Sequence, residues 1–188
     1  MRNALLTAIA AVSLLAACRE QARDEAATNA AAGNAAAGAA GAAANSSTAP
    51  PLGAPVAGEQ AKTVMKERHD GMEDIGDAMK LVSRELKSDS PDLARVRDGA
   101  ATIARLAPEV SGWFPPGTGP DVGKTDAKPE IWQKPEDFTA KRDTFQKAAQ
   151  EFNAAAQGSD LAAIRAAHGD LGKSCKACHD LYREKDKD

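Results

Sequence analysis

Residues 161–182 read LAAIRAAHGDLGKSCKACHDLY, a stretch near the end of the chain whose pattern decides the fold. Its larger side chains recur at alternating intervals of three and four residues, which places them on one face of an α-helix. The members of this face are Leu161, Ile164, His168, Leu171, Cys175, Cys178 and Tyr182. A helix with such a face is stabilised by other helices that cover it, so we expect both cysteines to project toward the interior of a helical bundle.

The pentapeptide Cys175-Lys176-Ala177-Cys178-His179 lies within this stretch and has the C-x-x-C-H pattern of a c-type haem attachment site. In such a site each thiol forms a thioether with one haem vinyl group, and the adjacent imidazole ligates the iron. A thioredoxin-like dithiol belongs after a β-strand, and no strand pattern precedes Cys175. A zinc site needs two more ligands, and the chain has no second cysteine pair. We therefore expect Cys175 and Cys178 to anchor one haem c, with His179 as the proximal ligand of its iron.

The first 17 residues have the pattern of a signal peptide. Residues 1–3 carry one positive charge, and the apolar run at 4–17 is too short to span a bilayer. The run ends in Leu-Ala-Ala before Cys18, which resembles the bacterial lipobox, so Cys18 is predicted to be the lipidated first residue of a mature lipoprotein. The alternative is an ordinary signal peptidase site that leaves Cys18 as a free thiol. Arg19 follows Cys18 where lipoproteins kept at the inner membrane often have Asp, which favours the outer membrane.

Residues 18–56 are predicted to be the lipidated cysteine and a flexible linker. The segment is dominated by Ala, Gly and Pro and has no apolar stripe, so no stable helix is expected. A flexible chain of this length has a root-mean-square span of roughly 30 to 40 Å, enough to hold the following domain clear of a membrane. The haem domain itself is expected at residues 57–188.

Composition and charge favour a helical core and argue against nucleic-acid binding. Hydrophobic residues make up 43% of the chain but aromatic residues only 4%, which favours an Ala-rich helical core over a sheet. The chain has 24 basic and 27 acidic side chains, and removal of the leader with Arg2 changes the net charge from −3 to −4. A mildly acidic surface without a basic block makes nucleic acid an unsuitable partner.

Three further helices are expected before residue 161. The first runs from about Gly58 to Lys87. One face of it carries Val64, Arg68, Met72, Ile75, Met79, Val82 and Leu86. The second carries Leu93, Val96, Ala100, Ile103 and Leu106, with Ser90 as N-cap and Pro91 at the first helical position, and Pro108 bends or ends it.

The third helix begins at Pro135, where the acidic residues of its first turn suit the helix dipole. It carries one aromatic residue per heptad, at Phe138, Phe145 and Phe152. The connection before it, residues 113–134, is rich in Pro and Gly and has no helical periodicity. A connection of this length in a compact domain is usually functional or covers another part of the molecule.

Four such helices with C-x-x-C-H in the last one resemble the cytochrome c′ family, including its low-spin cytochrome c-556 relatives. The resemblance covers about residues 57–185 and is carried by four short segments. These are Arg68-His69-Asp70-Gly71-Met72, Trp113-Phe114-Pro115-Pro116-Gly117, Ile131-Trp132 and residues 175–183. The resemblance implies an all-α, antiparallel four-helix bundle with covalently attached haem c, preceded here by the signal peptide and the disordered linker.

The same resemblance implies roles for two residues of the first helix. The residue four after the helix-one Arg faces the distal side of the haem in this family, and here that residue is Met72. A thioether ligand would give a low-spin His/Met centre, and we favour Met72 as distal ligand. In other members the same position crowds the iron without binding it, which leaves a five-coordinate iron able to bind NO or CO. Arg68 is expected to contact a haem propionate, or else to lie on the surface.

These interpretations lead to an expected function. We expect a periplasmic c-type cytochrome with one covalent haem that transfers single electrons to redox partner proteins of the envelope; the alternative is a five-coordinate haem protein that binds NO or CO. No His and Arg pair suited to splitting peroxide is evident, so we expect no enzymatic activity. A homodimer is compatible with the resemblance. His69 is expected to be a solvated surface residue, with a sixth ligand of the iron as the alternative. His168 is too far along its helix to ligate the same iron as His179, and is expected to be partly exposed, with a propionate contact as the alternative.

Overall fold

The computed structural model describes residues 52–185. The predicted signal peptide at 1–17, the lipidation site Cys18 and most of the predicted linker lie outside these described residues. The elements are α1 (Gly58–Lys87), α2 (Leu93–Leu106), the 3₁₀ helix η1 (Ala107–Gly112), α3 (Glu130–Gln133), α4 (Pro135–Ala156) and α5 (Leu161–Tyr182). Among the described helices, none combines the length and the apolar character that crossing a membrane would require.

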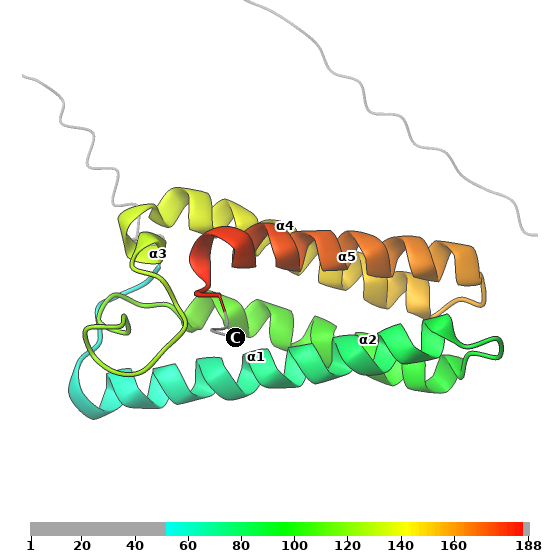
Figure 1. Cartoon of the computed structure of the whole chain (residues 1–188), viewed down its shortest axis with the longest axis horizontal. Coiled ribbons are helices and arrows are strands. Elements are labelled where there is room, and N and C mark those ends of the chain that lie inside the picture. Colours follow the sequence, from blue (N-terminus) through cyan, green and yellow to red (C-terminus); the bar gives the residue numbers. More distant parts are fainter. Residues whose placement is uncertain (1–51, 186–188) are drawn as a thin grey trace, which may run out of the picture. The chain divides into compact units, whose positions relative to one another are not determined.

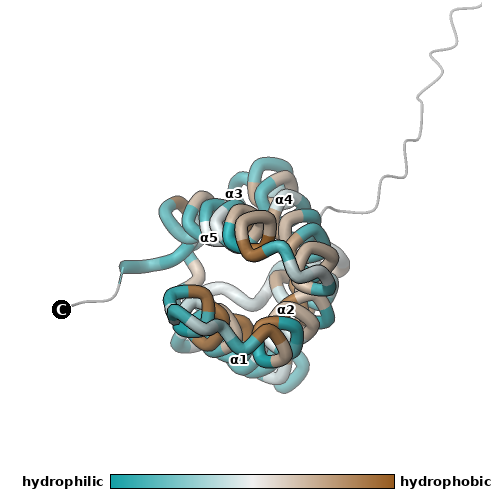
Figure 2. Tube along the Cα trace, turned by 90° about the vertical axis from the view of Figure 1, so that its right-hand side faces the viewer, coloured by the Kyte–Doolittle hydropathy of each residue, from teal (hydrophilic) through white to brown (hydrophobic). Residues whose placement is uncertain are grey.

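The four long helices form an antiparallel bundle, which confirms the predicted fold class. Figure 1 shows α1, α2, α4 and α5 running side by side, and Figure 2 shows them arranged around a common axis. Close backbone contacts join α1 to α2, α2 to α4 and α4 to α5. The fourth side of this ring, between α1 and α5, has the fewest close backbone contacts of the four. The bundle is therefore most open along the helix that carries the C-x-x-C-H motif.

The predicted apolar faces pack against one another in the bundle core. Phe138, Phe145 and Phe152 are all buried along α4, as the heptad spacing predicted. The largest side chains that are almost completely buried include Phe152, Ile103, Ile164 and Leu171, from three different helices. Burial of each such side chain contributes about 1.5 to 3 kcal/mol to folding, so this core is the main source of stability.

The start of α2 differs from the prediction. The helix begins at Leu93, and its N-cap is Asp92, whose Oδ1 accepts hydrogen bonds from the backbone N–H groups of Ala94 and Arg95 at 2.9 and 3.3 Å. The prediction of Ser90 as N-cap was therefore wrong. A carboxylate satisfies free N–H groups and also suits the positive end of the helix dipole, so Asp92 is the stronger cap.

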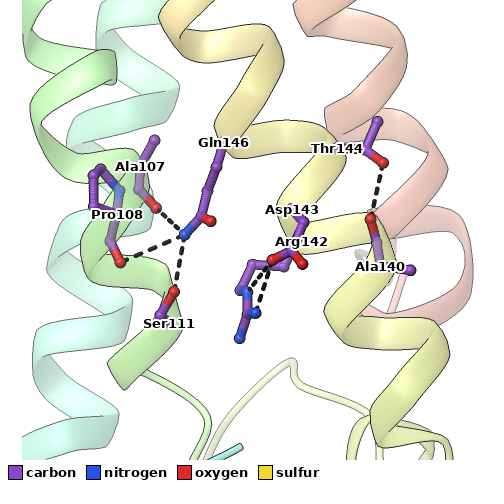
Figure 3. A network of polar contacts seen from close by, with 8 residues as sticks. All are labelled: Ala107, Pro108, Ser111, Ala140, Arg142, Asp143, Thr144 and Gln146. Atoms are coloured by element: carbon purple, nitrogen blue, oxygen red, sulfur yellow. Dashed lines mark hydrogen bonds and ion pairs between the residues drawn. The ribbon is translucent and has the colours of Figure 1, made fainter. Parts of the chain in front are cut away.

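Pro108 ends the α-helical part of the second helix, and the chain continues as η1. The backbone carbonyls released at this transition need other donors. The Gln146 amide supplies one of these donors, because Nε2 lies 2.9 Å from the Ala107 carbonyl and 2.9 Å from Ser111 Oγ. Figure 3 shows Gln146 reaching from α4 across to this segment. Gln146 thus joins the end of α2 and η1 to α4.

The folded domain begins earlier than the predicted boundary at residue 57. Leu52 is 5% exposed and belongs to the hydrophobic core. The Val56 N–H donates to the Pro116 carbonyl at 2.9 Å, so this short segment lies against the connection that follows η1. Gly117 has a φ of +91°, and a Cβ built there would lie 2.0 Å from the Val56 carbonyl oxygen. Only glycine suits this close approach.

Candidate haem site

Helix α5 carries the C-x-x-C-H motif in its last two turns, and it holds both cysteines against the core. Cys175 and Cys178 are half-buried free thiols that pack against the core, whereas His179 is exposed at the edge of that face. Burial raises the pKa of the Cys175 thiol and raises that of Cys178 to about 11. The pKa of His179 is lowered, first by partial desolvation of the ring and then by the positive charge of Arg183. The thiols are therefore protonated at neutral pH, and the imidazole is neutral, the form that binds a metal.

Two side-chain contacts establish how α1 and α5 are aligned. His168 Nε2 lies 3.3 Å from Ser83 Oγ, and Arg165 Nε donates to the Leu86 carbonyl at 3.1 Å. From the first contact to the second, the α1 partner moves forward by three residues, from Ser83 to Leu86. The α5 partner moves back by three, from His168 to Arg165, so both contacts belong to one antiparallel alignment of the two helices.

The same alignment, extended along both helices, predicts the heights of Met72 and His179 along the bundle axis. Eleven residues separate Ser83 from Met72, and eleven separate His168 from His179. Both helices are continuous over these eleven residues, a length of about 16 Å at 1.5 Å per residue. Met72 of α1 therefore lies level with His179 of α5, across the most open side of the bundle.

Two glycines on these helices have open space where a side chain would be. Gly76 on α1 and Gly172 on α5 are both half-buried, yet a Cβ built on either would find no other protein atom within 4 Å. Met72 and Met79 are also only half-buried although both pack against the core. Half-buried apolar side chains beside unfilled space match what a haem would cover, so the residues present fit this cofactor.

Arg68 is a buried cation whose hydrogen bonds hold the connection after η1, residues 113–134, which leads to α4. It is 5% exposed, and its two terminal nitrogens donate four hydrogen bonds at 3.0 to 3.2 Å. The acceptors are the Trp113 carbonyl, the Thr118 hydroxyl and carbonyl, and the Thr125 hydroxyl. The guanidinium also lies 5.0 Å from the centre of the Phe114 ring.

All of these partners are uncharged. No carboxylate within residues 52–185 forms an ion pair with Arg68. Desolvation lowers the pKa of this guanidinium to about 10, and it remains protonated at neutral pH. A buried cation without a counter-ion would be stabilised by an anion placed beside it. This charge is compatible with the predicted propionate contact.

Gly71, next to Met72, has a packing role that the sequence did not reveal. A Cβ built at Gly71 would lie 2.3 Å from Trp113 Cη2. The indole thus lies directly on the α1 backbone at the turn that carries Met72. Trp113 is itself buried and belongs to the core, so a larger residue at Gly71 would have to displace it. The contact helps to fix the height of Met72 relative to the core.

The end of α5 is held by residues that sequence reasoning missed. The Tyr182 hydroxyl donates to the Asp137 carboxylate of α4, and its ring packs edge to face on Phe138. Desolvation and this carboxylate together raise the pKa of Tyr182. The Lys128 N–H donates to the Tyr182 carbonyl at 2.9 Å, and the Glu184 N–H to the Asp126 carbonyl. No local pattern predicts these partners, because they are 44 to 58 residues away in the chain.

The two other histidines lie where the sequence indicated. His69 is exposed, and its Nε2 lies 3.6 Å from the Glu73 carboxylate one turn along α1. His168 is half-buried, and its ring meets the edge of Phe152 at a centroid distance of 5.6 Å. Beside the motif, Lys173 and Lys176 form exposed ion pairs with Asp170 and Asp180.

The chain is similar to proteins of one family over almost all of the bundle. A family model described as Cytochrome C′ matches residues 63–183. A cytochrome c′ of Alcaligenes xylosoxydans xylosoxydans is 41% identical over 101 residues, which cover 53% of this chain and 76% of that relative. A cytochrome c-554 of Cereibacter sphaeroides is 36% identical over 132 residues, covering 68% of this chain and 97% of that relative.

Solved structures give the same result. A cytochrome c′ described as having an unusual ligand-controlled dimer dissociation is 31% identical, with a TM-score of 0.62, and the match covers 66% of this chain and 97% of that one. The nitric oxide complex of a variant of cytochrome c prime from Alcaligenes xylosoxidans is 34% identical, with a TM-score of 0.58 and the same coverage.

Proposed function

Because this chain belongs to the cytochrome c′ family and carries haem c, we propose that it transfers single electrons in the periplasm and has no enzymatic turnover. The haem iron, when bound, supplies a one-electron Fe(III)/Fe(II) couple. The chain's own residues must then hold the haem, set its axial ligands and limit access of other molecules to the iron.

Cys175 and Cys178 are proposed to attach the haem, with His179 as proximal and Met72 as distal ligand. The observation that carries this proposal is the register between α1 and α5, which puts Met72 level with His179. With Met72 and His179 as its two ligands, the iron would have a raised potential and no open position. Both properties suit an electron carrier better than a ligand-binding protein.

Arg68 is proposed to contact a haem propionate, which would supply the counter-ion that the protein lacks. Its guanidinium lies one turn before Met72 on the same face of α1, and it is already held by the connection after η1. A guanidinium held in place by four hydrogen bonds can bind a carboxylate with little loss of side-chain entropy. Arg68 would thus link the connection to the cofactor.

The second candidate function is binding of NO or CO by a five-coordinate iron. It is favoured by the nitric oxide complex of the Alcaligenes xylosoxidans relative. It is also compatible with the partial burial of Met72, since a side chain at this place can crowd the iron without ligating it. The two functions differ in one property, the occupancy of the sixth position of the iron.

The absorption spectrum of the reduced protein, recorded with and without CO, separates the two functions. We expect sharp α and β bands that CO does not alter. Met72→Leu should broaden these bands and allow CO to bind, because Leu retains the volume of Met but has no ligand atom. Met79→Leu is the matched control, since Met79 is another half-buried methionine on the same face of α1. A CO-sensitive spectrum in the unmodified protein would instead establish the gas-binding alternative.

The attachment residues are tested separately from the axial ligands. In a Cys175→Ala, Cys178→Ala double variant, the haem should be lost on a denaturing gel because no thioether can form. Haem staining that persists in this variant would refute the assignment of these cysteines.

The cellular setting is proposed from the N-terminal sequence, which lies outside the described residues. Cys18 would carry lipid, and residues 19–51 would link the bundle to a membrane, with the outer membrane favoured. Redox partner proteins of the envelope would then reach the haem domain from the periplasm. A homodimer is also proposed, on the analogy of the relative with a ligand-controlled dimer. Cys18→Ser should release the protein into the soluble periplasmic fraction, whereas continued membrane association would contradict lipidation.

A further inference from the structure

The exposed face of α1 carries a group of metal-ligating side chains that the haem site does not use. His69, Asp70 and Glu73 each offer one donor atom, and these three atoms lie within 4.8 Å of one another. His69 Nε2 and Glu73 Oε2 are 3.6 Å apart, as expected for residues four apart on a helix. An ion between the three atoms would meet one nitrogen and two oxygens from a single turn of helix.

The donor set distinguishes this group from an ordinary acidic surface. Imidazole nitrogen is a preferred ligand of zinc and copper, whereas magnesium and calcium prefer sites made only of oxygen. The three residues lie near the middle of a 30-residue helix, so the backbone that spaces them is rigid. Their side chains are 50 to 69% exposed, so an ion can reach them without any change in the fold.

The surrounding charges also favour a cation. Residues 67–77 contain five exposed carboxylates, from Glu67, Asp70, Glu73, Asp74 and Asp77. Two cationic side chains lie on the same part of α1, Lys66, which pairs with Asp70, and Arg68, which is buried, so the five carboxylates outnumber them. The local field at His69 is therefore negative, which increases the concentration of divalent cations near it.

We propose that His69, Asp70 and Glu73 form a surface site for a borderline first-row dication such as Zn²⁺. Three protein ligands leave at least one position of a tetrahedral ion to water, so the site is an open one. The proposal is independent of the axial ligands of the haem and stands whichever proposed function is correct.

Lys66 competes with the metal for one ligand. Its ammonium group forms an ion pair with Asp70, and this pair raises the pKa of Lys66. A metal that binds Asp70 must break this contact. The ion pair is highly exposed and therefore weak, so it reduces metal affinity without preventing binding. Removal of the Lys66 charge should therefore strengthen the site.

Calorimetric titration of the purified full-length holo-protein with ZnCl₂ tests the proposal. We expect one equivalent of Zn²⁺ to bind at this site. His69→Ala should weaken this binding at least about tenfold, because loss of even an outer-shell partner of a metal ligand costs 10- to 100-fold in affinity. Glu73→Gln should weaken it similarly, and Lys66→Met should strengthen it.

Glu151→Gln is the matched control, because Glu151 is an exposed α4 carboxylate that pairs with a lysine four residues away. It should leave Zn²⁺ binding unchanged. The variants alter exposed side chains only, so their circular dichroism should match that of the unmodified protein. Unchanged Zn²⁺ affinity in His69→Ala, or no binding to the unmodified protein, would overturn the proposal. Unchanged affinity in Lys66→Met would remove Asp70 from the site and overturn the three-ligand arrangement.

Discussion

At the scale of single residues, Arg68 connects the packing of the bundle to its site. Sequence spacing puts Arg68 among six apolar residues on one face of α1, and burial of a charged side chain there is costly unless it is hydrogen-bonded. The structure resolves this conflict, because the guanidinium replaces its lost water with four hydrogen bonds from the connection after η1. The residue is therefore structural as well as a candidate contact of the haem.

Replacement of Arg68 by Met should destabilise the protein by about 3 kcal/mol, since several buried acceptors would lose their donor. Thermal unfolding followed by circular dichroism measures the effect. Arg84→Met is the control, because Arg84 lies on the exposed surface of the same helix. Equal melting temperatures for the two variants would contradict a structural role for Arg68.

Gly71 illustrates a residue whose importance depends on one contact. Gly71→Ala should destabilise the protein by about 1 to 3 kcal/mol, although Ala favours helix, because the new methyl group would overlap the buried Trp113 ring. Gly169→Ala on α5 should instead be neutral or stabilise by up to about 1 kcal/mol, since a Cβ there meets nothing within 4 Å. Urea unfolding of both variants provides the comparison. A stabilised Gly71→Ala would show that Trp113 can move aside.

At the scale of elements, α5 is held near both of its ends. Its N-terminal half is tied to α1 through His168 and Arg165, and its C-terminal end to α4 through Tyr182. Between these ties, the α1 side of α5 stays open at Gly172. The motif is thus carried by a helix that is fixed in position while one of its sides remains free for a cofactor.

Because His168 is half-buried and contacts Ser83, we expect the free energy of unfolding to depend on pH. Burial, and then the charge of Lys87, lower the pKa of His168 below its ordinary 6.5, although the Met79 carbonyl opposes this shift. Above pH 6.5 the ring is neutral in both the folded and the unfolded chain, so protonation of His168 does not change the free energy of unfolding. As the pH falls below 6.5, the unfolded chain binds a proton on this ring before the folded chain does, so the free energy of unfolding decreases.

Urea unfolding at pH 7.5 and pH 5.5 tests this expectation. The unmodified protein should lose more stability between the two values than His168→Gln, whose amide can still bond to Ser83 but does not titrate. The same loss in both proteins would show that other groups cause the pH dependence.

At the scale of the whole molecule, the connection after η1 acts as a clamp across one end of the bundle. It contacts α1 through Arg68, α5 through Lys128, and the segment before α1 through Pro116. The expectation that so long a connection covers another part of the molecule is met by these contacts. Leu52 and Val56 extend this end of the domain by five residues beyond the predicted boundary.

A chain that begins at Gly58 should therefore be less stable than one that begins at Asn45, when both are exported and loaded with haem. The loss should be about 2 kcal/mol or more, because removal of a buried leucine alone costs that much. Leu52→Ala in the longer chain should reproduce most of the difference. Equal melting temperatures for the two chains would restore the boundary at residue 57.

Local patterns predicted α1, α4 and α5 well, since periodic apolar residues and proline at a helix start act within a few turns. They were less reliable where two local signals compete. Ser90 and Asp92 both suit an N-cap, and only the structure shows that Asp92 is used. The partners of Arg68 and Tyr182 could not be predicted, because each is a contact between segments distant in sequence.

The C-x-x-C-H pentapeptide and four periodic apolar faces were sufficient to determine the cofactor and the helical bundle. The reason is that covalent haem chemistry and helix periodicity depend on neighbours only a few residues apart. The tertiary structure decided that Met72 lies level with His179, that Trp113 packs on Gly71 and that the α1 and α5 side stays open. These features depend on contacts between segments about 40 to 110 residues apart, which are set by packing and by a few long-range hydrogen bonds.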